Sequence, residues 1–267
     1  MLTSQRWWRS FPFVLALISL IFIGWSAYLS FTYPHDGILS YSNSGVINEL
    51  DAFGEFQNNL RLGDKIESVD GVPLIDAIPF YVNKSPGESV NFVVVRNGEQ
   101  ITLPVRLQQP GTELIIDLVV ILVLALVFWG MGVGVLSFKP GDNTSNLFFL
   151  FTQVSALMLA TGLSSSVGPP IFSSIFNALL WVLGPITVHL HNYFPQQIQF
   201  RRRREVLVGL YAIALLGGLP YLLLGTKTIR SFLWASQLYT VGLIFLIINL
   251  IFVIGLLIYD YRHATSP

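Results

Sequence analysis

Few side chains in this sequence have the types and the spacing that chemistry requires. His189 and His191 are two residues apart, so on a helix they would lie on different faces and would share a metal ion poorly. The H-E-x-x-H pattern, which holds zinc between two histidines one helical turn apart, is absent. The G-x-x-x-x-G-K-[ST] phosphate loop and the G-x-S-x-G nucleophile pattern are absent too. We therefore expect no catalytic residue, no cofactor and no metal site in this chain.

The composition indicates what kind of protein carries these side chains. Of the 267 residues, 53% are hydrophobic and only 11% are charged, whereas soluble domains usually carry about 25% charged residues. So few charges cannot cover the surface of a soluble protein of this size. The chain has no cysteine, which excludes disulfides and cysteine-ligated metal sites.

Six apolar runs are long enough to form membrane-spanning helices, since about 20 residues cross a hydrocarbon layer of about 30 Å. We interpret the first run, which follows Arg6 and Arg9, as a retained signal anchor rather than a cleaved signal peptide. The six runs cover residues 11–31, 114–138, 147–162, 171–194, 206–224 and 232–259. They predict a membrane α-helical bundle.

Polar and small residues within these runs are candidates for helix contacts. Asp117 is either an intramembrane functional residue or a residue in interfacial water, and we favour the second interpretation. Asn177 and Asn249 are candidates for interhelical hydrogen bonds. Three glycines of the second run favour close helix packing: Gly130, Gly132 and Gly134.

The positions of Lys and Arg predict the orientation, because positive charge near a span resists translocation. With six spans, eight of these residues fall on one side of the membrane and two fall in the short loops on the other. The larger set is Arg6, Arg9, Lys139, Arg201, Arg202, Arg203, Arg204 and Arg262, and the smaller set is Lys227 and Arg230. We expect both termini in the cytoplasm and the segment between the first two spans outside it. We interpret the four consecutive arginines as a stop-transfer signal and headgroup anchor, and expect no nucleic-acid partner.

The segment between the first two spans is the part of the chain that could fold in water. Residues 33–109 contain ten acidic and five basic residues and several turn signals. Stretches rich in β-branched residues predict strands at 45–47, 65–69, 90–95 and 100–105, and residues 76–82 predict a short helix. Asn97-Gly98 predicts a type I′ hairpin between the last two strands, and Asp70-Gly71 a second tight turn.

A motif in this segment carries a resemblance. The run Leu60-Arg61-Leu62-Gly63-Asp64-Lys65-Ile66 is followed by Ser68-Val69-Asp70-Gly71 and then by Gly87-Glu88-Ser89-Val90. This order resembles a bacterial PDZ domain in its circularly permuted form. Residues 54–59 depart from the resemblance, since they replace the usual alanine-rich helix start. It implies a small inserted α+β or β domain at residues 33–112, with these structural residues: Leu60, Gly63, Asp64, Ile66, Asp70 and Gly71.

The resemblance also implies a ligand. PDZ domains add an extended peptide to a sheet edge and hold its terminal carboxylate with backbone N–H groups. The matching stretch here is Asp36, Gly37, Ile38 and Leu39, where Gly37 would allow close approach and Ile38 and Leu39 would contact an apolar side chain. The alternative is a linker and a core strand, with the domain serving as a spacer or a dimer contact.

A second resemblance covers the spans. The run His189-Leu190-His191-Asn192-Tyr193-Phe194-Pro195 precedes a basic loop, in a chain whose PDZ-like domain separates its first two spans. This is similar to the membrane sensor region of ComP-type bacterial histidine kinases. The phosphate-accepting histidine and the ATP-binding motifs of these kinases are absent here. The resemblance therefore implies that a phosphotransfer or phosphatase domain would follow residues 260–267.

These observations predict one organisation. Residues 1–32 form the cytoplasmic start and the first span, 33–112 the extracytoplasmic PDZ-like domain, 113–259 five further spans and 260–267 a cytoplasmic tail. We expect a sensory input module in the cell membrane that binds a peptide, a protein or an envelope signal. Its protein partner would be a second copy of the chain, in a homodimer, or a cytoplasmic kinase. The alternatives are an N-terminal part of a histidine kinase and a non-signalling scaffold.

Overall fold

The computed structural model describes residues 2–42, 44–51, 55, 57–74, 84–167, 169–194, 202–231 and 237–264. The predicted helix at 76–82, residues 54 and 56 of the atypical segment, and Arg201 lie outside these residues. The six long helices are α1 (Leu2–Thr32), α4 (Thr112–Phe138), α5 (Asn143–Val167), α6 (Pro170–His191), α7 (Arg203–Ser231) and α8 (Leu238–Ala264). Each contains a stretch long and apolar enough to cross a membrane. The chain is therefore a multi-pass membrane protein, as the apolar runs predict.

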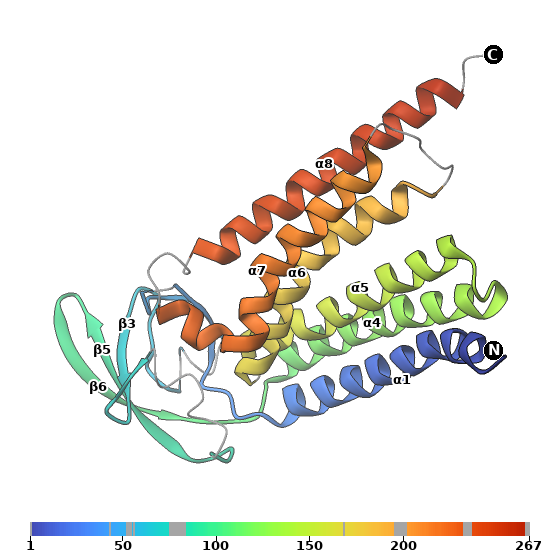
Figure 1. Cartoon of the computed structure of the whole chain (residues 1–267). Coiled ribbons are helices and arrows are strands. Elements are labelled where there is room, and N and C mark those ends of the chain that lie inside the picture. Colours follow the sequence, from blue (N-terminus) through green and yellow to red (C-terminus); the bar gives the residue numbers. More distant parts are fainter. Residues whose placement is uncertain are drawn as a thin grey trace.

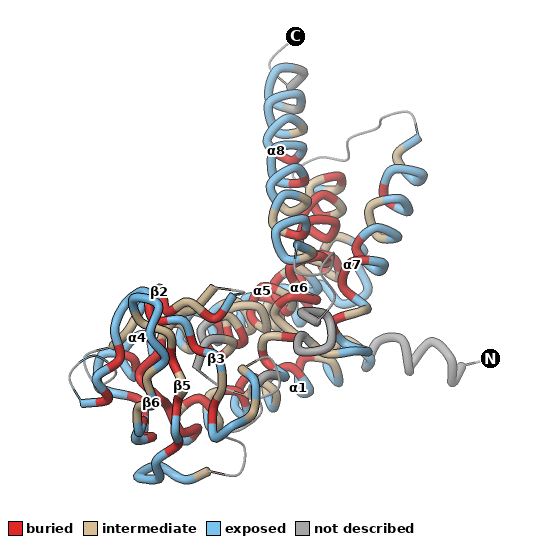
Figure 2. Tube along the Cα trace, turned by 90° about the vertical axis from the view of Figure 1, so that its left-hand side faces the viewer, coloured by how far each residue is buried: buried red, intermediate tan, exposed pale blue. Residues whose placement is uncertain are grey.

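The helices form two groups of three that meet at α5 and α6. Helices α1, α4 and α5 contact one another, α6 contacts both α7 and α8, and α5 packs against α6. The two groups diverge in Figure 1 towards the end that carries both chain termini. In α6, 61% of the span is buried, against 17–39% in the other five helices, and Figure 2 shows its buried residues beside the largely exposed α8. Helix α6 is therefore the central helix of the second group.

Glycines allow the close packing around α6. The ring of Trp181 fills the space in which a Cβ atom of Gly217 or Gly242 would stand, so neither α7 nor α8 can carry a side chain there. On α4, a Cβ at Gly132 would collide with Thr152 of α5, which confirms one of the three predicted packing glycines. The prediction is wrong for the other two, Gly130 and Gly134, because both face open space.

The predicted interhelical hydrogen bonds of two asparagines are also wrong. The amide of Asn177 donates to Ser173 Oγ at 3.5 Å, and that of Asn249 donates to the Phe245 carbonyl at 2.7 Å, both within their own helices. In both cases the acceptor lies four residues earlier, one helical turn away, where a side chain finds a partner without help from a second helix. Asp117 is exposed on α4.

The segment between α1 and α4, residues 33–111, has six strands in the part that the structure describes and is called the strand domain below. The strands are β1 (Ile38–Tyr41), β2 (Ile47–Leu50), β3 (Lys65–Val69), β4 (Val72–Pro73), β5 (Ser89–Arg96) and β6 (Glu99–Arg106). All pairs are antiparallel, in a β1–β2 ribbon and a four-stranded sheet of order β4-β3-β5-β6. An isolated bridge from Val46 to Lys65 connects the two sheets. The sequence predicts β3, β5 and β6 correctly and places β2 two residues early. It assigns no strand at β4 and gives β1 only as the core strand of the alternative interpretation.

Tight turns and an alternating pattern hold these strands in register. The β5–β6 hairpin turns at Asn97 and Gly98, with φ angles of 53° and 85°, as a type I′ turn requires. Asp70 and Gly71, with φ angles of 47° and 78°, turn β3 into β4. Both turns are as predicted. Alternate residues of the strands bury an apolar core made of Ile38, Ile47, Leu60, Ile66, Val69, Val90, Phe92, Val94, Val105 and Leu107.

Candidate functional site

The stretch predicted to bind a ligand carboxylate lies where the strand domain leaves α1. Gly37 has a φ of 92°, in the left-handed region that favours glycine. Its carbonyl accepts the Asp51 N–H at 2.9 Å. The Ile38 N–H donates to the Asp36 carboxylate at 2.8 Å. One predicted carboxylate-binding amide is therefore already bound to a carboxylate of the chain itself.

The two apolar residues of the stretch have different surroundings. Ile38 is buried in the core of the strand domain. Leu39 is half-buried and, like Phe31 of α1, packs against the cluster that Leu114 and Leu118 of α4 form. The stretch thus contacts the membrane helices on one side and the domain core on the other.

The other motif residues are structural. Leu60 and Ile66 belong to the core. Asp64, which follows Gly63 (φ 87°), is buried and accepts two hydrogen bonds from the Arg96 guanidinium, at 2.8 and 2.7 Å. It also accepts the Arg61 N–H at 2.9 Å. The hydrogen bonds with Asp64 raise the pKa of Arg96 further. This pair fixes the turn before β3 to the end of β5.

The connections of the strand domain to α1 and α4 run side by side. His35 and Gln108 form an antiparallel bridge, in which the His35 N–H donates to the Gln108 carbonyl at 2.8 Å and the Gln108 N–H to the His35 carbonyl at 2.9 Å. Asn58 ties both connections together. Its amide nitrogen donates to the carbonyls of Asp36 and Arg106 at 2.9 and 3.1 Å, and its oxygen accepts the Arg106 N–H at 2.9 Å. Asn58 is only 2% exposed.

The imidazole of His35 lies in the same place, buried between two carboxylates. Its Nε2 is 3.2 Å from Asp51 Oδ2 and its Nδ1 is 3.9 Å from Asp36 Oδ1. Burial lowers the pKa of His35, but the contact with Asp51 and the charges of Asp36 and Asp51 outweigh it, so the pKa is raised. Next to it, burial and then the charge of Asp36 raise the pKa of Tyr33 to about 12. We call residues 33–36 and 106–108, together with Asp51 and Asn58, the joint.

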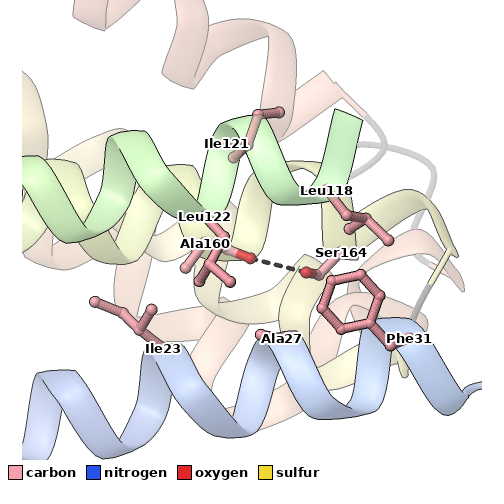
Figure 3. Close-up of a pocket in the computed structure, with 8 residues that line it drawn as sticks. All are labelled: Ile23, Ala27, Phe31, Leu118, Ile121, Leu122, Ala160 and Ser164. Carbon is pink, nitrogen blue, oxygen red and sulfur yellow. Dashed lines mark hydrogen bonds between the residues drawn. The ribbon is translucent and has the colours of Figure 1, made fainter. Parts of the chain in front are cut away.

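Below the joint, hydroxyl groups bind α1 to α5. Ser30 Oγ lies 2.7 Å from Ser164 Oγ and 2.8 Å from the Ser26 carbonyl, and Ser26 Oγ donates to the Ala160 carbonyl at 2.9 Å. All three serines are buried. Figure 3 shows the cavity beside them, between α1, α4 and α5, with Ser164 donating to Ala160. Its volume of about 20 Å³ has room for about one water molecule.

The histidine motif lies at the other end of the bundle. His189 Nδ1 is 3.1 Å from the Tyr211 hydroxyl of α7, whereas His191 Nδ1 is 2.9 Å from the Thr187 carbonyl of its own helix. The two rings thus have separate partners. Within the described residues, no group of three or more His, Asp or Glu side chains is arranged to hold a metal ion.

Comparison with known proteins adds no identity: no protein-family model matches the chain, and no curated protein matches its sequence. The joint must therefore be interpreted from its own geometry. The sequence reasoning missed His35, Asp51 and Asn58, because their partners are up to 48 residues away and no local spacing marks them.

Proposed function

We propose that this chain is a membrane-embedded signal-input module, in which the strand domain receives a signal outside the cell and α1 carries it into the bundle. The observation that carries the proposal is the joint. Both connections between the strand domain and the membrane helices are held there by one buried asparagine and one backbone bridge. A displacement of β1 therefore acts directly on the end of α1.

In this proposal the strand domain is PDZ-like and binds the free C-terminus of an apolar peptide or protein at residues 36–39. The ligand carboxylate would take the place of the Asp36 carboxylate on the Ile38 amide. Asp36 adjoins His35, so a ligand at this stretch would change the charge and the packing of the joint. A signal results only if the ligand binds two arrangements of the bundle with different affinities.

The serine contacts between α1 and α5 provide the next step. Movement of α1 would change the Ser30–Ser164 contact, and α5 packs against the central helix α6. In this proposal both termini are cytoplasmic and the chain carries no catalytic step of its own. The output belongs to a histidine kinase, as the resemblance of the histidine motif implies, and a homodimer would bring two such outputs together.

The binding part is tested with the whole protein in lipid nanodiscs and a peptide library with free and amidated C-termini, read by fluorescence polarisation. Free-acid apolar peptides should bind at least tenfold more tightly than their amides, because one charge-assisted hydrogen bond contributes about 1.5–3 kcal/mol. Gly37→Val should abolish this binding. Gly98→Val is the matched control, because it places the same side chain at another positive-φ glycine, in the β5–β6 turn. Equal binding of acids and amides would show that the carboxylate site is wrong.

The transmission part uses the absence of native cysteine. In a Ser30→Cys/Ser164→Cys variant, the rate of disulfide formation reports how close α1 and α5 are. A bound free-acid peptide should change this rate at least threefold, and Asn58→Ala should weaken that response without preventing binding. Peptide binding with an unchanged rate would favour the non-signalling scaffold.

A further inference from the structure

Four side chains gather at the end of the bundle opposite the strand domain, where α6 ends and α7 begins, and a fifth residue, Asn192, adjoins one of them in the chain. The Arg203 guanidinium carbon stacks 4.1 Å from the centre of the Tyr193 ring. The His189 ring lies 5.7 Å from the ring of Tyr193 and 5.8 Å from that of Tyr211. Asn192 adjoins Tyr193 in the chain and is fully buried. We call these five residues the polar cluster.

Two members of the polar cluster have buried polar atoms without a hydrogen-bond partner: Asn192, which is buried, and Arg203, which is half-buried. Neither the oxygen nor the nitrogen of the Asn192 amide has a hydrogen-bond partner, and Nη2 of Arg203 has none either. Buried polar groups nearly always have a partner, since leaving one unpaired costs free energy. A guanidinium nitrogen can only donate, so the partner missing at Arg203 is an acceptor.

The surrounding charge indicates that this acceptor is an anion. Arg202, Arg203 and Arg204 are consecutive, and the free backbone N–H groups of the first turn of α7 begin at Arg203. The acidic residue of that turn, Glu205, is exposed and lies 3.6 Å from Arg202. Among the described residues, no ion pair joins a carboxylate to Arg203.

We propose that the polar cluster binds a phosphate group, and that the phosphate belongs to an anionic membrane lipid. Phosphate combines negative charge with several acceptor oxygens, which suits a guanidinium, an amide nitrogen and a helix N-terminus. The cluster lies at the end of two spans, where lipid headgroups are the most concentrated source of phosphate. Tyr193 holds the guanidinium in place by a cation–π contact. This site goes beyond the signal-input function and does not depend on it.

The test measures lipid binding by native mass spectrometry of the whole protein, released from detergent with phosphatidylglycerol or phosphatidylcholine. The wild-type chain should retain phosphatidylglycerol at least tenfold more strongly than phosphatidylcholine. Arg203→Gln should remove most of this preference. Arg204→Gln is the matched control: it removes an equal charge from the neighbouring exposed position and should reduce retention less than threefold.

A second variant keeps the test decisive if Arg203→Gln does not fold. Asn192→Asp has almost the same shape but adds a negative charge next to Tyr193, on which the guanidinium stacks, so it should also abolish the preference. In a separate arm, inorganic phosphate replaces the lipid. Binding of inorganic phosphate that depends on Arg203 would support the anion site and identify a soluble source. Equal losses in Arg203→Gln and Arg204→Gln would overturn the proposal, because they would indicate only diffuse attraction to the basic loop.

Discussion

Two buried asparagines at opposite ends of this molecule have contrasting surroundings. Asn58 in the joint uses both atoms of its amide, in three hydrogen bonds to the main chain of two segments. Asn192 in the polar cluster uses neither atom. The same side chain, almost equally buried, is a structural tie in one place and, in our proposal, part of a phosphate site in the other. Burial alone therefore does not distinguish a structural polar residue from a binding residue, but its partners do.

The largest expected effect on stability comes from removing the hydrogen bonds of Asn58 in the joint. Asn58→Ala would remove the three hydrogen bonds that its amide makes to the carbonyls of Asp36 and Arg106 and to the N–H of Arg106. We expect it to lower the free energy of local unfolding of the joint by about 2–4 kcal/mol. Hydrogen–deuterium exchange of the whole protein would show faster exchange in residues 34–39 and 104–109. An unchanged rate in these peptides would contradict the structural role of Asn58.

The next largest effect on the stability of the joint is expected from the charge state of His35. Because its pKa is raised in the folded protein, the protonated ring stabilises the joint fully below the unfolded pKa of about 6.5. This contribution is lost as the pH rises through the raised pKa of the folded state. Amide hydrogen exchange in the joint, corrected for the intrinsic pH dependence of the exchange reaction, should therefore be slower at pH 6 than at pH 8.5. His35→Gln should remove the difference, whereas a persisting difference would assign it to another group.

A smaller effect is expected from the serine contacts. Ser30→Ala removes a hydroxyl that contacts Ser164 and the Ser26 carbonyl, and hydrogen bonds between membrane helices contribute about 0.6 kcal/mol on average. We expect a loss of about 0.5–1 kcal/mol in the free energy of unfolding, measured by steric trapping in bicelles. Ser137→Ala is a suitable control, since Ser137 is exposed and bonds only within α4. A loss above 2 kcal/mol would mean that the serines hold the bundle together more strongly than a single contact can.

The smallest effect on stability is expected from a substitution of the other asparagine, Asn192 in the polar cluster. Asn192→Leu removes two unpartnered polar atoms and keeps the volume, so in neutral detergent without phosphate it should change the stability by less than about 0.5 kcal/mol or increase it. Stability is measured by thermal unfolding. In this assay, added phosphatidylglycerol should stabilise the wild-type chain more than the variant. A large destabilisation without lipid would indicate that Asn192 has an internal partner after all.

The sequence predicts those features of the fold that depend on local signals. Six apolar runs indicate six helices, and Asn97-Gly98 and Asp70-Gly71 indicate turns, because each signal lies within the element that it forms. Strand β1 appears only within the alternative interpretation, because the PDZ resemblance assigns its first residues to a ligand-binding stretch. Asn58, His35 and Asp51 are missed because they act through partners far along the chain. Asn177 and Asn249 mislead because a sequence does not show whether an amide bonds to its own helix.

The candidate ligand stretch shows the same limit. Gly37 has the positive φ that its residue type suggests, but no pattern in the sequence indicates that Asp36 already occupies the amide of Ile38. That bond depends on the backbone conformation of residues 36–38, in which Gly37 has its positive φ angle.

The bridge between His35 and Gln108 also bears on how such a protein can be altered. Paired residues of antiparallel strands have Cα atoms about 4.5–5.5 Å apart, so the end of α1 and the start of α4 are already neighbours, whatever folds between them. The strand domain is thus an insertion whose first and last residues lie next to each other. A two-residue turn in place of residues 36–107 would close the chain into a simple helical hairpin, and another small domain with adjacent termini would fit the same position. Domains of different kinds could then be exchanged at this bridge without redesign of the membrane helices.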